Sequence, residues 1–172
     1  MKNNKNLELS GDYIAGFTDG EGCFDLQFRR DVRHERSGKP VYYSWKVQFV
    51  INIRKDDDEI LRKIHDVLNC GQIHFTEREV RYSVQDLENL KNIIIPFFNK
   101  YPLSGKKKMD FKLWAEAVDI LYLNKGKFGK TWNKKDFQRL IKIHKLMQEF
   151  KSKRPQGFKW VSLAESIVQT LK

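Results

Sequence analysis

The stretch Ile14-Ala15-Gly16-Phe17-Thr18-Asp19-Gly20-Glu21-Gly22 decides the fold, because it places glycines and two carboxylates at the end of one short helix. Ser10 is a natural N-cap, and the helix that follows carries Gly16 and Gly20 on one face. A glycine inside a helix costs about 1 kcal/mol relative to alanine. The pattern therefore predicts that a second helix approaches this face closely. We expect Gly22 to end the helix in a left-handed conformation.

The two carboxylates, Asp19 and Glu21, lie at the C-terminal end of this predicted helix. The helix dipole disfavours anions there and favours a nearby cation. An alternative interpretation is a glycine-rich turn between a helix and a strand, with both acids merely solvated.

Composition points to a soluble globular protein with a polyanionic partner. The 172 residues suit a single domain, and 40% of them are hydrophobic. No apolar run approaches the roughly 20 residues of a membrane helix, and the N-terminus lacks the apolar core of a secretion signal. We therefore expect an intracellular protein. The net charge of +11 favours nucleic acid over a membrane surface. Cys23 and Cys70 are too few for a disulfide scaffold and are expected as free thiols.

Two long segments of alternating polarity, residues 23–33 and 42–54, follow the glycine-rich stretch and predict adjacent strands. One face of each is apolar, as in Phe24, Leu26 and Phe28. The other carries the side-chain types that pair with base edges and phosphates. The outward residues that we expect to contact DNA are Asp25, Gln27, Arg29, Arg33, Ser44, Lys46, Gln48, Asn52 and Arg54. A solvated face explains the alternation, but strands this long exceed the needs of an ordinary sheet.

The next segments repeat the same kinds of element. Four acids at 56–59 start a helix that runs to about Leu68, and we interpret them as capping groups rather than a metal site. Gly71 is expected to terminate this helix. Residues 72–76 and 80–85 predict two short strands, with Ile73 and Phe75 in the core. Their outward polar residues, which extend the expected DNA-binding face, are His74, Thr76, Arg78, Arg81 and Ser83.

A helix from Asp86 to about Tyr101, bent by Pro96, completes the order helix, two strands, helix, two strands, helix. Later helices are expected near residues 111–121 and 136–150, and in the tail from 151 to 172. These segments would either clamp flanking phosphates or cap the core.

The nonapeptide resembles the motif of the LAGLIDADG homing endonucleases, in the variant that ends Gly-Glu-Gly. The αββαββα order, obtained from periodicity, is also that of the family's fold. The resemblance covers roughly residues 8–121 and is concentrated in the nonapeptide and in residues 49–71. It implies one α+β domain, residues 1–172, with a long four-stranded antiparallel DNA-binding sheet and a C-terminal helical extension over about 122–172.

The resemblance implies a site-specific DNA endonuclease that hydrolyses both strands of a long, partly palindromic duplex. Only one nonapeptide is present, so the family's logic requires a homodimer whose motif helices pack through Tyr13, Gly16 and Gly20. Alternatives on the same fold are an intron RNA maturase, for which intron RNA is the partner, and a non-cleaving DNA-binding regulator. Organellar introns, in mitochondria or chloroplasts, and microbial introns both carry such genes.

In the family, the acidic residue at the eighth motif position holds the catalytic metal, which here is Glu21, with the Gly20 carbonyl as a further ligand. Mg²⁺ is expected because carboxylate and phosphate oxygens are hard ligands, and Mn²⁺ or Ca²⁺ are other ions that suit the site. The family's active-site lysine corresponds best to Lys106, with Lys107 next. Asp19 is expected to cap or hydrogen-bond nearby structure, and a role as a further metal ligand is the alternative.

The sequence departs from the family at the edge of this site. Well-known members carry a glutamine near the end of the second strand and a basic residue four positions later. Ile53 and Asp57 occupy those positions here, and neither can order active-site waters in the same way. Asn52, Arg54 and Lys55 are the candidate substitutes.

Overall fold

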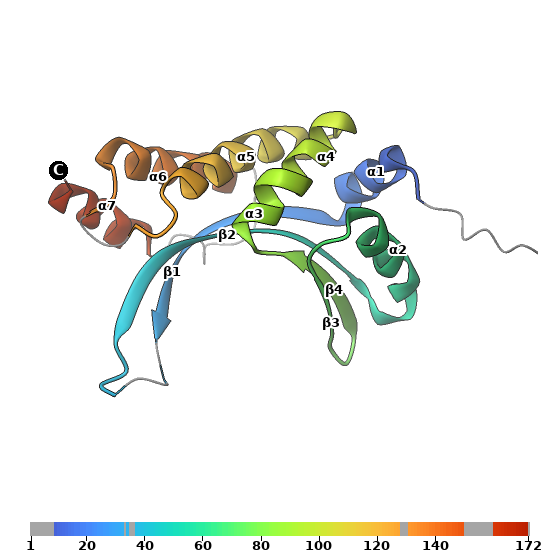
Figure 1. Ribbon diagram of the computed structural model, residues 1–172, viewed down its shortest axis with the longest axis horizontal. Coiled ribbons are helices and arrows are strands. Elements are labelled where there is room, and N and C mark those ends of the chain that lie inside the picture. The colour runs from blue at the N-terminus through green and yellow to red at the C-terminus, as the bar shows by residue number, and fades with distance from the viewer. Residues whose placement is uncertain (1–8, 33, 35–36, 128–130, 150–159, 172) are drawn as a thin grey trace, which may run out of the picture. The chain divides into compact units, whose positions relative to one another are not determined.

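A computed structural model describes residues 9–32, 34, 37–127, 131–149 and 160–171, and Figure 1 labels its helices and strands. The elements are α1 (Gly11–Glu21), β1 (Gly22–Val32), β2 (Val41–Arg54), a 3-10 turn η1 (Lys55–Asp57), α2 (Asp58–Leu68), β3 (Gln72–Phe75), β4 (Glu79–Val84), α3 (Leu87–Asn89), a π-helical turn η2 (Leu90–Ile94), α4 (Ile95–Lys100), α5 (Lys107–Leu123), α6 (Lys134–Glu149) and α7 (Val161–Thr170). The predicted α+β class and the αββαββα order are confirmed. Arg33, an expected DNA contact, lies outside the described residues.

One four-stranded sheet has the strand order β1-β2-β4-β3. β4 pairs antiparallel with β2, so that Phe49 lies opposite Val84 and Asn52 opposite Arg81. β3 pairs antiparallel with β4 and places His74 opposite Arg81. The period of two leaves Phe24, Leu26 and Phe28 buried on β1 while the residues between them stay accessible. This alternation is what the sequence predicts for a sheet with one apolar face.

The chain divides into two compact units, residues 1–24 with 48–109 and residues 25–47 with 110–172. β1 and β2 each contribute a part to both. The core of the first unit is aromatic: the rings of Phe24, Phe49 and Phe98 lie 5.3–5.5 Å apart between centroids. In Figure 1, α2 lies beside β3 and β4, which it contacts.

The second unit packs its helices around a second aromatic cluster. Phe28 lies 5.1 Å from Trp45 and 5.9 Å from Phe137, between ring centroids. His144 is fully buried in α6, and its Nδ1 is 2.9 Å from the carbonyl oxygen of Leu26. α6 and α7 lie side by side (Figure 1). These contacts show that the helices after residue 122 carry core residues of their own.

A two-pronged ion pair joins α5 to α6 in this unit. Arg139 donates from Nε and Nη2 to the two carboxylate oxygens of Glu116, at 2.5 and 2.6 Å. The hydrogen bonds from Arg139 lower the pKa of Glu116, against a smaller opposing effect of burial. The same bonds raise the pKa of Arg139. The pair is therefore charged at neutral pH, which the sequence does not reveal.

Two helix ends differ from the prediction. Gly22 is extended, with φ −74° and ψ 159°, rather than left-handed. Glycine is required there for a steric reason, because a Cβ would lie 2.5 Å from Thr18 Cγ2 and 2.8 Å from the Thr18 carbonyl oxygen. At the end of α2, Asn69 takes the left-handed conformation (φ 49°) ahead of Gly71, as asparagine is able to do.

Phe75, predicted in the core, is 47% exposed. It lies on β3, which is an edge strand, and the Arg62 guanidinium stands 5.2 Å from its ring centroid. The predicted helix over 86–101 contains the π-helical turn η2, which ends at Ile94, two residues before Pro96. Proline lacks the N–H for a regular helical hydrogen bond. No helix in the described ranges is long and apolar enough to cross a membrane.

Candidate functional site

The C-terminal end of α1 is held in a defined place by local packing. The Ser10 hydroxyl accepts a hydrogen bond from the Tyr13 N–H at 3.2 Å and caps the helix start. Ile14 and Thr18 are fully buried. Glu21 is the last helical residue and is exposed, and β1 begins at the next residue. Glu21 therefore presents its carboxylate to solvent from a short helix that is fixed at both ends.

Asp19 connects this helix end to the loop before α5. Its Oδ2 accepts hydrogen bonds from the backbone N–H of Ser104 at 2.7 Å and of Gly105 at 3.0 Å. A Cβ on Gly105 would lie 3.1 Å from Asp19 Oδ1, so the loop approaches as closely as glycine allows. Asp19 Oδ1 is buried and has no hydrogen-bond partner among the described residues. The capping role expected for Asp19 agrees with these contacts.

Lys107 places a positive charge on the same helix end. Its ammonium donates to the carbonyl oxygen of Asp19 at 2.7 Å and to that of Gly20 at 2.8 Å. These carbonyls lie at the negative end of the helix dipole. Lys106, predicted as the better candidate, is exposed and not the residue that reaches Gly20. The difference arises because Asp19 fixes the loop and thereby the direction in which each lysine of the triplet leaves it.

Two oxygen groups of this helix end are hard ligands of the kind that Mg²⁺ prefers, namely the exposed Glu21 carboxylate and the Gly20 carbonyl, whereas Asp19 Oδ1 is buried. The Lys107 ammonium shows that two carbonyls of this end already bind a cation. Within the described ranges no three His, Cys, Asp or Glu side chains cluster as a metal site.

One face of α1 is open. A Cβ added to Gly16 or to Gly20 would meet no atom of the described chain within 4 Å, and Tyr13 on the same helix is 49% exposed. Gly11 behaves differently, because its Cβ would lie 2.3 Å from the Tyr101 ring. The start of α1 is thus tightly packed. The stripe of its surface from Tyr13 to Gly20 is not covered by the described chain, and this is where the sequence predicts a second helix.

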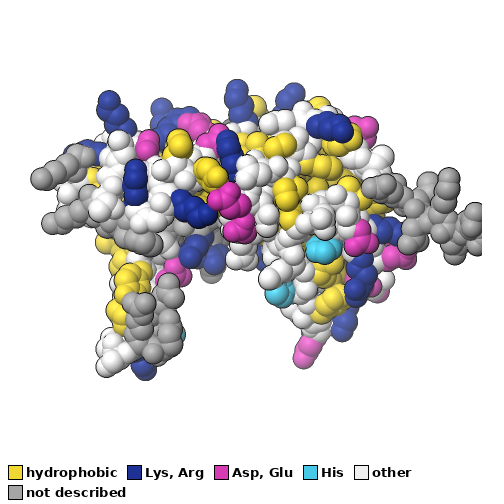
Figure 2. Space-filling view, viewed as in Figure 1, with side chains coloured by type: hydrophobic (Ala, Val, Ile, Leu, Met, Phe, Trp, Pro, Cys, Tyr) yellow, Lys and Arg dark blue, Asp and Glu magenta, His cyan; other side chains and the backbone are white. Residues whose placement is uncertain are grey.

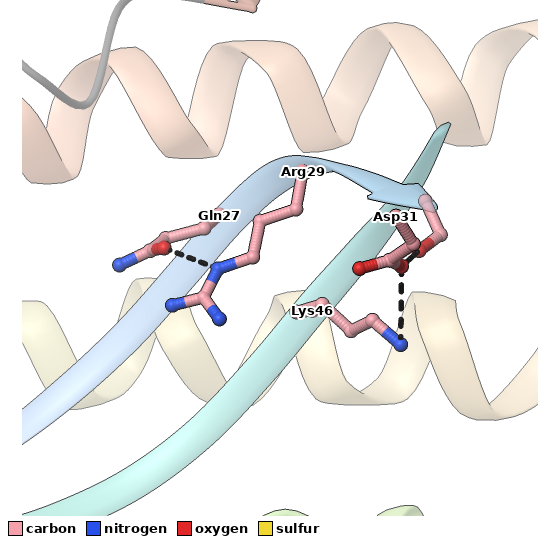
Figure 3. Close-up of polar contacts among 5 residues, drawn as sticks. Gln27, Arg29, Asp31 and Lys46 are labelled. Carbon is pink, nitrogen blue, oxygen red and sulfur yellow. Dashed lines mark hydrogen bonds and ion pairs between the residues drawn. The ribbon is translucent and has the colours of Figure 1, made fainter. Parts of the chain in front are cut away.

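The polar face in the second unit is an ordered network of side chains (Figure 3). Gln27 donates to Asp25 at 2.7 Å and accepts from Arg29 Nε at 2.6 Å. Asp31 accepts from the Ser44 hydroxyl at 2.9 Å and pairs with the Lys46 ammonium at 3.5 Å. The five described residues of this unit that are expected to contact DNA, Asp25, Gln27, Arg29, Ser44 and Lys46, are accessible, and several are joined to one another or to Asp31 by hydrogen bonds.

The polar face in the first unit is more loosely connected. Arg81 donates to Gln48 at 3.1 Å, and Arg54 forms an ion pair with Asp56 at 2.6 Å. The expected contacts Asn52, Arg54, His74, Thr76 and Arg78 are exposed. Ser83, which is also expected to contact DNA, is only 4% exposed. The alternation puts Ser83 among the outward polar residues, but the folded chain leaves little of it accessible.

Basic charge is spread over several elements. Figure 2 shows Lys and Arg side chains standing out along α5 and α6, with acidic side chains between them. Burial raises the pKa of the Cys70 thiol, which is therefore not an activated nucleophile. The carbonyl of Cys70 accepts from the Tyr82 hydroxyl at 2.7 Å, and burial raises the pKa of that hydroxyl too. Both groups belong to the core.

Comparisons of the sequence with known proteins agree on one family. The model of a family described as LAGLIDADG endonuclease matches residues 14–118. Probable intron-encoded endonuclease 3 of Neurospora crassa is 30% identical over 118 residues, which are 67% of this chain and 21% of that protein. Probable intron-encoded DNA endonuclease 1 of Mycosarcoma maydis is 30% identical over 115 residues, 67% of this chain and 39% of that protein. The chain thus spans about a fifth to two fifths of the length of these relatives.

Solved structures agree on the fold. The LAGLIDADG meganuclease I-AabMI, bound to uncleaved DNA, is 30% identical with a TM-score of 0.60, covering 78% of this chain and 43% of its own. The homing endonuclease I-TnaI is 23% identical with a TM-score of 0.67, covering 94% of this chain and 99% of its own. I-SmaMI, bound to uncleaved DNA in the presence of calcium ions, is 20% identical with a TM-score of 0.66, covering 86% of this chain and 50% of its own. At such identities the last two show the fold alone.

Proposed function

The chain belongs to the LAGLIDADG endonuclease family, and from that premise we propose that it is a homodimeric, site-specific DNA endonuclease. It hydrolyses both strands of a long, partly palindromic duplex with a divalent metal. The observation that carries the proposal is the end of α1, where an exposed Glu21 adjoins an unoccupied glycine face and the Lys107 ammonium. The unit of function is one endonuclease domain with a core over about residues 8–121 and a helical extension over about 122–172.

Glu21 is the proposed metal ligand, and the Gly20 carbonyl is the second. Bound there, Mg²⁺ would neutralise charge on the scissile phosphate and lower the pKa of the attacking water. Lys107 is proposed in place of Lys106 as the lysine that stabilises the phosphate, because its ammonium already lies 2.8 Å from the Gly20 oxygen. Asp19 positions Lys107 by holding the N–H groups of the loop. It does not itself contact the phosphate.

The homodimer is proposed from the open stripe of α1. An exposed tyrosine and two glycines without neighbours within 4 Å leave room for the same helix of a second copy. A two-fold axis through the paired helices makes the interface self-complementary and brings two copies of Glu21 together. Each then serves one strand of the duplex, which explains how a chain with one acidic motif cleaves both.

The polar face of the sheet is the proposed DNA-binding surface. Its exposed or half-buried residues are Asp25, Gln27, Arg29, Ser44, Lys46, Gln48, Asn52, Arg54, His74, Thr76, Arg78 and Arg81. The net charge of +11 favours association with phosphates. Binding should weaken steeply as salt rises, because neutralised phosphates release their counterions.

The test is cleavage by the purified chain and by its Glu21→Gln variant. Plasmids carrying the chain's insertion-site sequence are incubated with Mg²⁺, and binding to the same duplex is measured in parallel. The proposal expects site-specific double-strand cuts by the natural chain, and binding without cuts by the variant. Equal cleavage by both would eliminate Glu21 as the metal ligand. Binding of intron RNA without cleavage of any duplex would favour the maturase alternative instead.

The proposed setting is an organelle or a microbial cell whose introns encode such proteins. Several relatives are named as intron-encoded, and a further relative, 29% identical over 140 residues, is the uncharacterized mitochondrial protein RF1 of Saccharomyces cerevisiae.

A further inference from the structure

Three side chains on β1 form a continuous chain of hydrogen bonds along the polar face. Asp25, Gln27 and Arg29 share this face because they are two residues apart. The Gln27 amide donates from Nε2 to Asp25 Oδ2 at 2.7 Å, and its Oε1 accepts from Arg29 Nε at 2.6 Å. Figure 3 shows the Gln27 carbonyl turned toward the guanidinium.

The two neighbours together fix the orientation of the Gln27 amide. If the amide were reversed, its NH₂ group would face the donor Nε, and its oxygen would face a carboxylate oxygen. Both contacts would be repulsive. The chain of donors therefore has one direction, from Arg29 through Gln27 to Asp25. Gln27 has both ends of its amide engaged, so it is poorly placed to read a base by itself.

One pair of N–H groups on the Arg29 guanidinium remains available for a bidentate hydrogen bond. A guanidinium offers either Nε with one Nη, or the two Nη groups, to a pair of acceptors. Gln27 occupies Nε, and among the described residues this is the only hydrogen bond of Arg29, which is exposed. Nη1 and Nη2 are therefore left available on an exposed side chain. Guanine offers the matching pair of acceptors, O6 and N7, in the major groove.

Local charge argues for base readout rather than phosphate binding at this point. Asp25 and Asp31 offset Arg29 and Lys46 on the same part of the face, and Asp31 is paired with Lys46 at 3.5 Å. A phosphate-binding surface would carry an excess of unpaired positive charge. A network of paired acids and bases instead holds a donor in place while adding little long-range attraction.

Resting on the proposed function, we propose that Arg29 reads a guanine through Nη1 and Nη2 at one base pair of each half-site. Gln27 and Asp25 are positioning residues: they hold the guanidinium in the orientation that presents this edge. The specificity-determining unit is thus the hydrogen-bonded row on β1, with one reader and two supports, rather than three independent contacts.

The test is selection of bound duplexes from a randomised double-stranded library by the full chain, at fixed salt and without Mg²⁺. The natural chain should enrich guanine at one position of each half-site. Arg29→Ala should lose that preference by roughly 5- to 150-fold with other positions unchanged. Gln27→Met should weaken it by roughly 2- to 10-fold, since the guanidinium must then be ordered on binding.

Arg30→Ala is the matched control, because it removes the same charge from the neighbouring exposed residue of β1. It should leave every base preference unchanged. Uniformly weaker binding of Arg29→Ala on all sequences would assign Arg29 to a phosphate and overturn the inference, as would an unchanged preference in Gln27→Met. If the natural chain enriches a site and Arg29→Ala keeps the guanine preference, this inference is refuted and the proposed function is not. If the natural chain enriches no duplex, the proposed function is refuted as well.

Discussion

Gly16→Ala should affect folding and assembly in opposite directions. The new methyl group meets no atom of the described chain within 4 Å, so the monomer gains helix propensity without a clash. Replacing a helical glycine with alanine should stabilise the isolated chain by about 1 kcal/mol. In a protein of this size that raises the Tm by roughly 2–4 °C.

The same methyl group should weaken the proposed dimer. It would lie between two helices that approach through glycines, and overpacking costs about 1–3 kcal/mol for each group. A two-fold axis doubles every substitution, so the dimer should lose about 2–6 kcal/mol, or roughly 30-fold to more than 10⁴-fold in affinity.

Urea unfolding of dilute protein and sedimentation over a concentration series measure the two effects separately. Gly11→Ala is the control. Its new Cβ would lie 2.3 Å from the Tyr101 ring, so this substitution should destabilise the monomer. The reasoning is refuted if Gly16→Ala lowers the free energy of unfolding of the monomer. It is refuted equally if self-association is unchanged.

Three other substitutions test the site and the fold. Lys107→Met should lower kcat by about 10²-fold or more while DNA binding is kept, because Lys107 is the described lysine that donates to the Gly20 carbonyl. An equal loss in Lys106→Met would contradict this placement. Asp19→Ala removes the acceptor of two loop N–H groups. It should lower the free energy of unfolding, measured by urea titration, by about 1–3 kcal/mol. An unchanged urea midpoint would refute the role of Asp19 in holding the loop. Arg139 holds the pKa of Glu116 below the ordinary carboxyl value. The Glu116–Arg139 pair therefore stabilises the fold fully at pH values above the ordinary carboxyl pKa. This stabilisation is lost as the pH falls through the lowered pKa. The effect, at most about 1 kcal/mol for so exposed a pair, should disappear from the pH dependence of stability in Arg139→Leu.

Much of the fold is predictable because its signals are local. Alternation over residues 23–33 and 42–54 locates β1 and β2 to within a residue or two. Other features depend on distant neighbours and escape prediction. Phe75 alternates as a core residue but lies on an edge strand, and Ser83 alternates as a surface residue but is covered. Periodicity reports which face a side chain takes, not what packs over that face.

The same division holds at the site. By itself the sequence determined that an acid ends a glycine-bearing helix, and that a lysine-rich loop and two polar strands accompany it, because residue type and spacing specify these. Only the tertiary structure decided that Lys107 rather than Lys106 meets the helix end, and that Arg29 is held by Gln27 and Asp25. Three successive lysines look alike in sequence, and only a loop held by Asp19, 85 residues earlier in the chain than Ser104, gives each a direction.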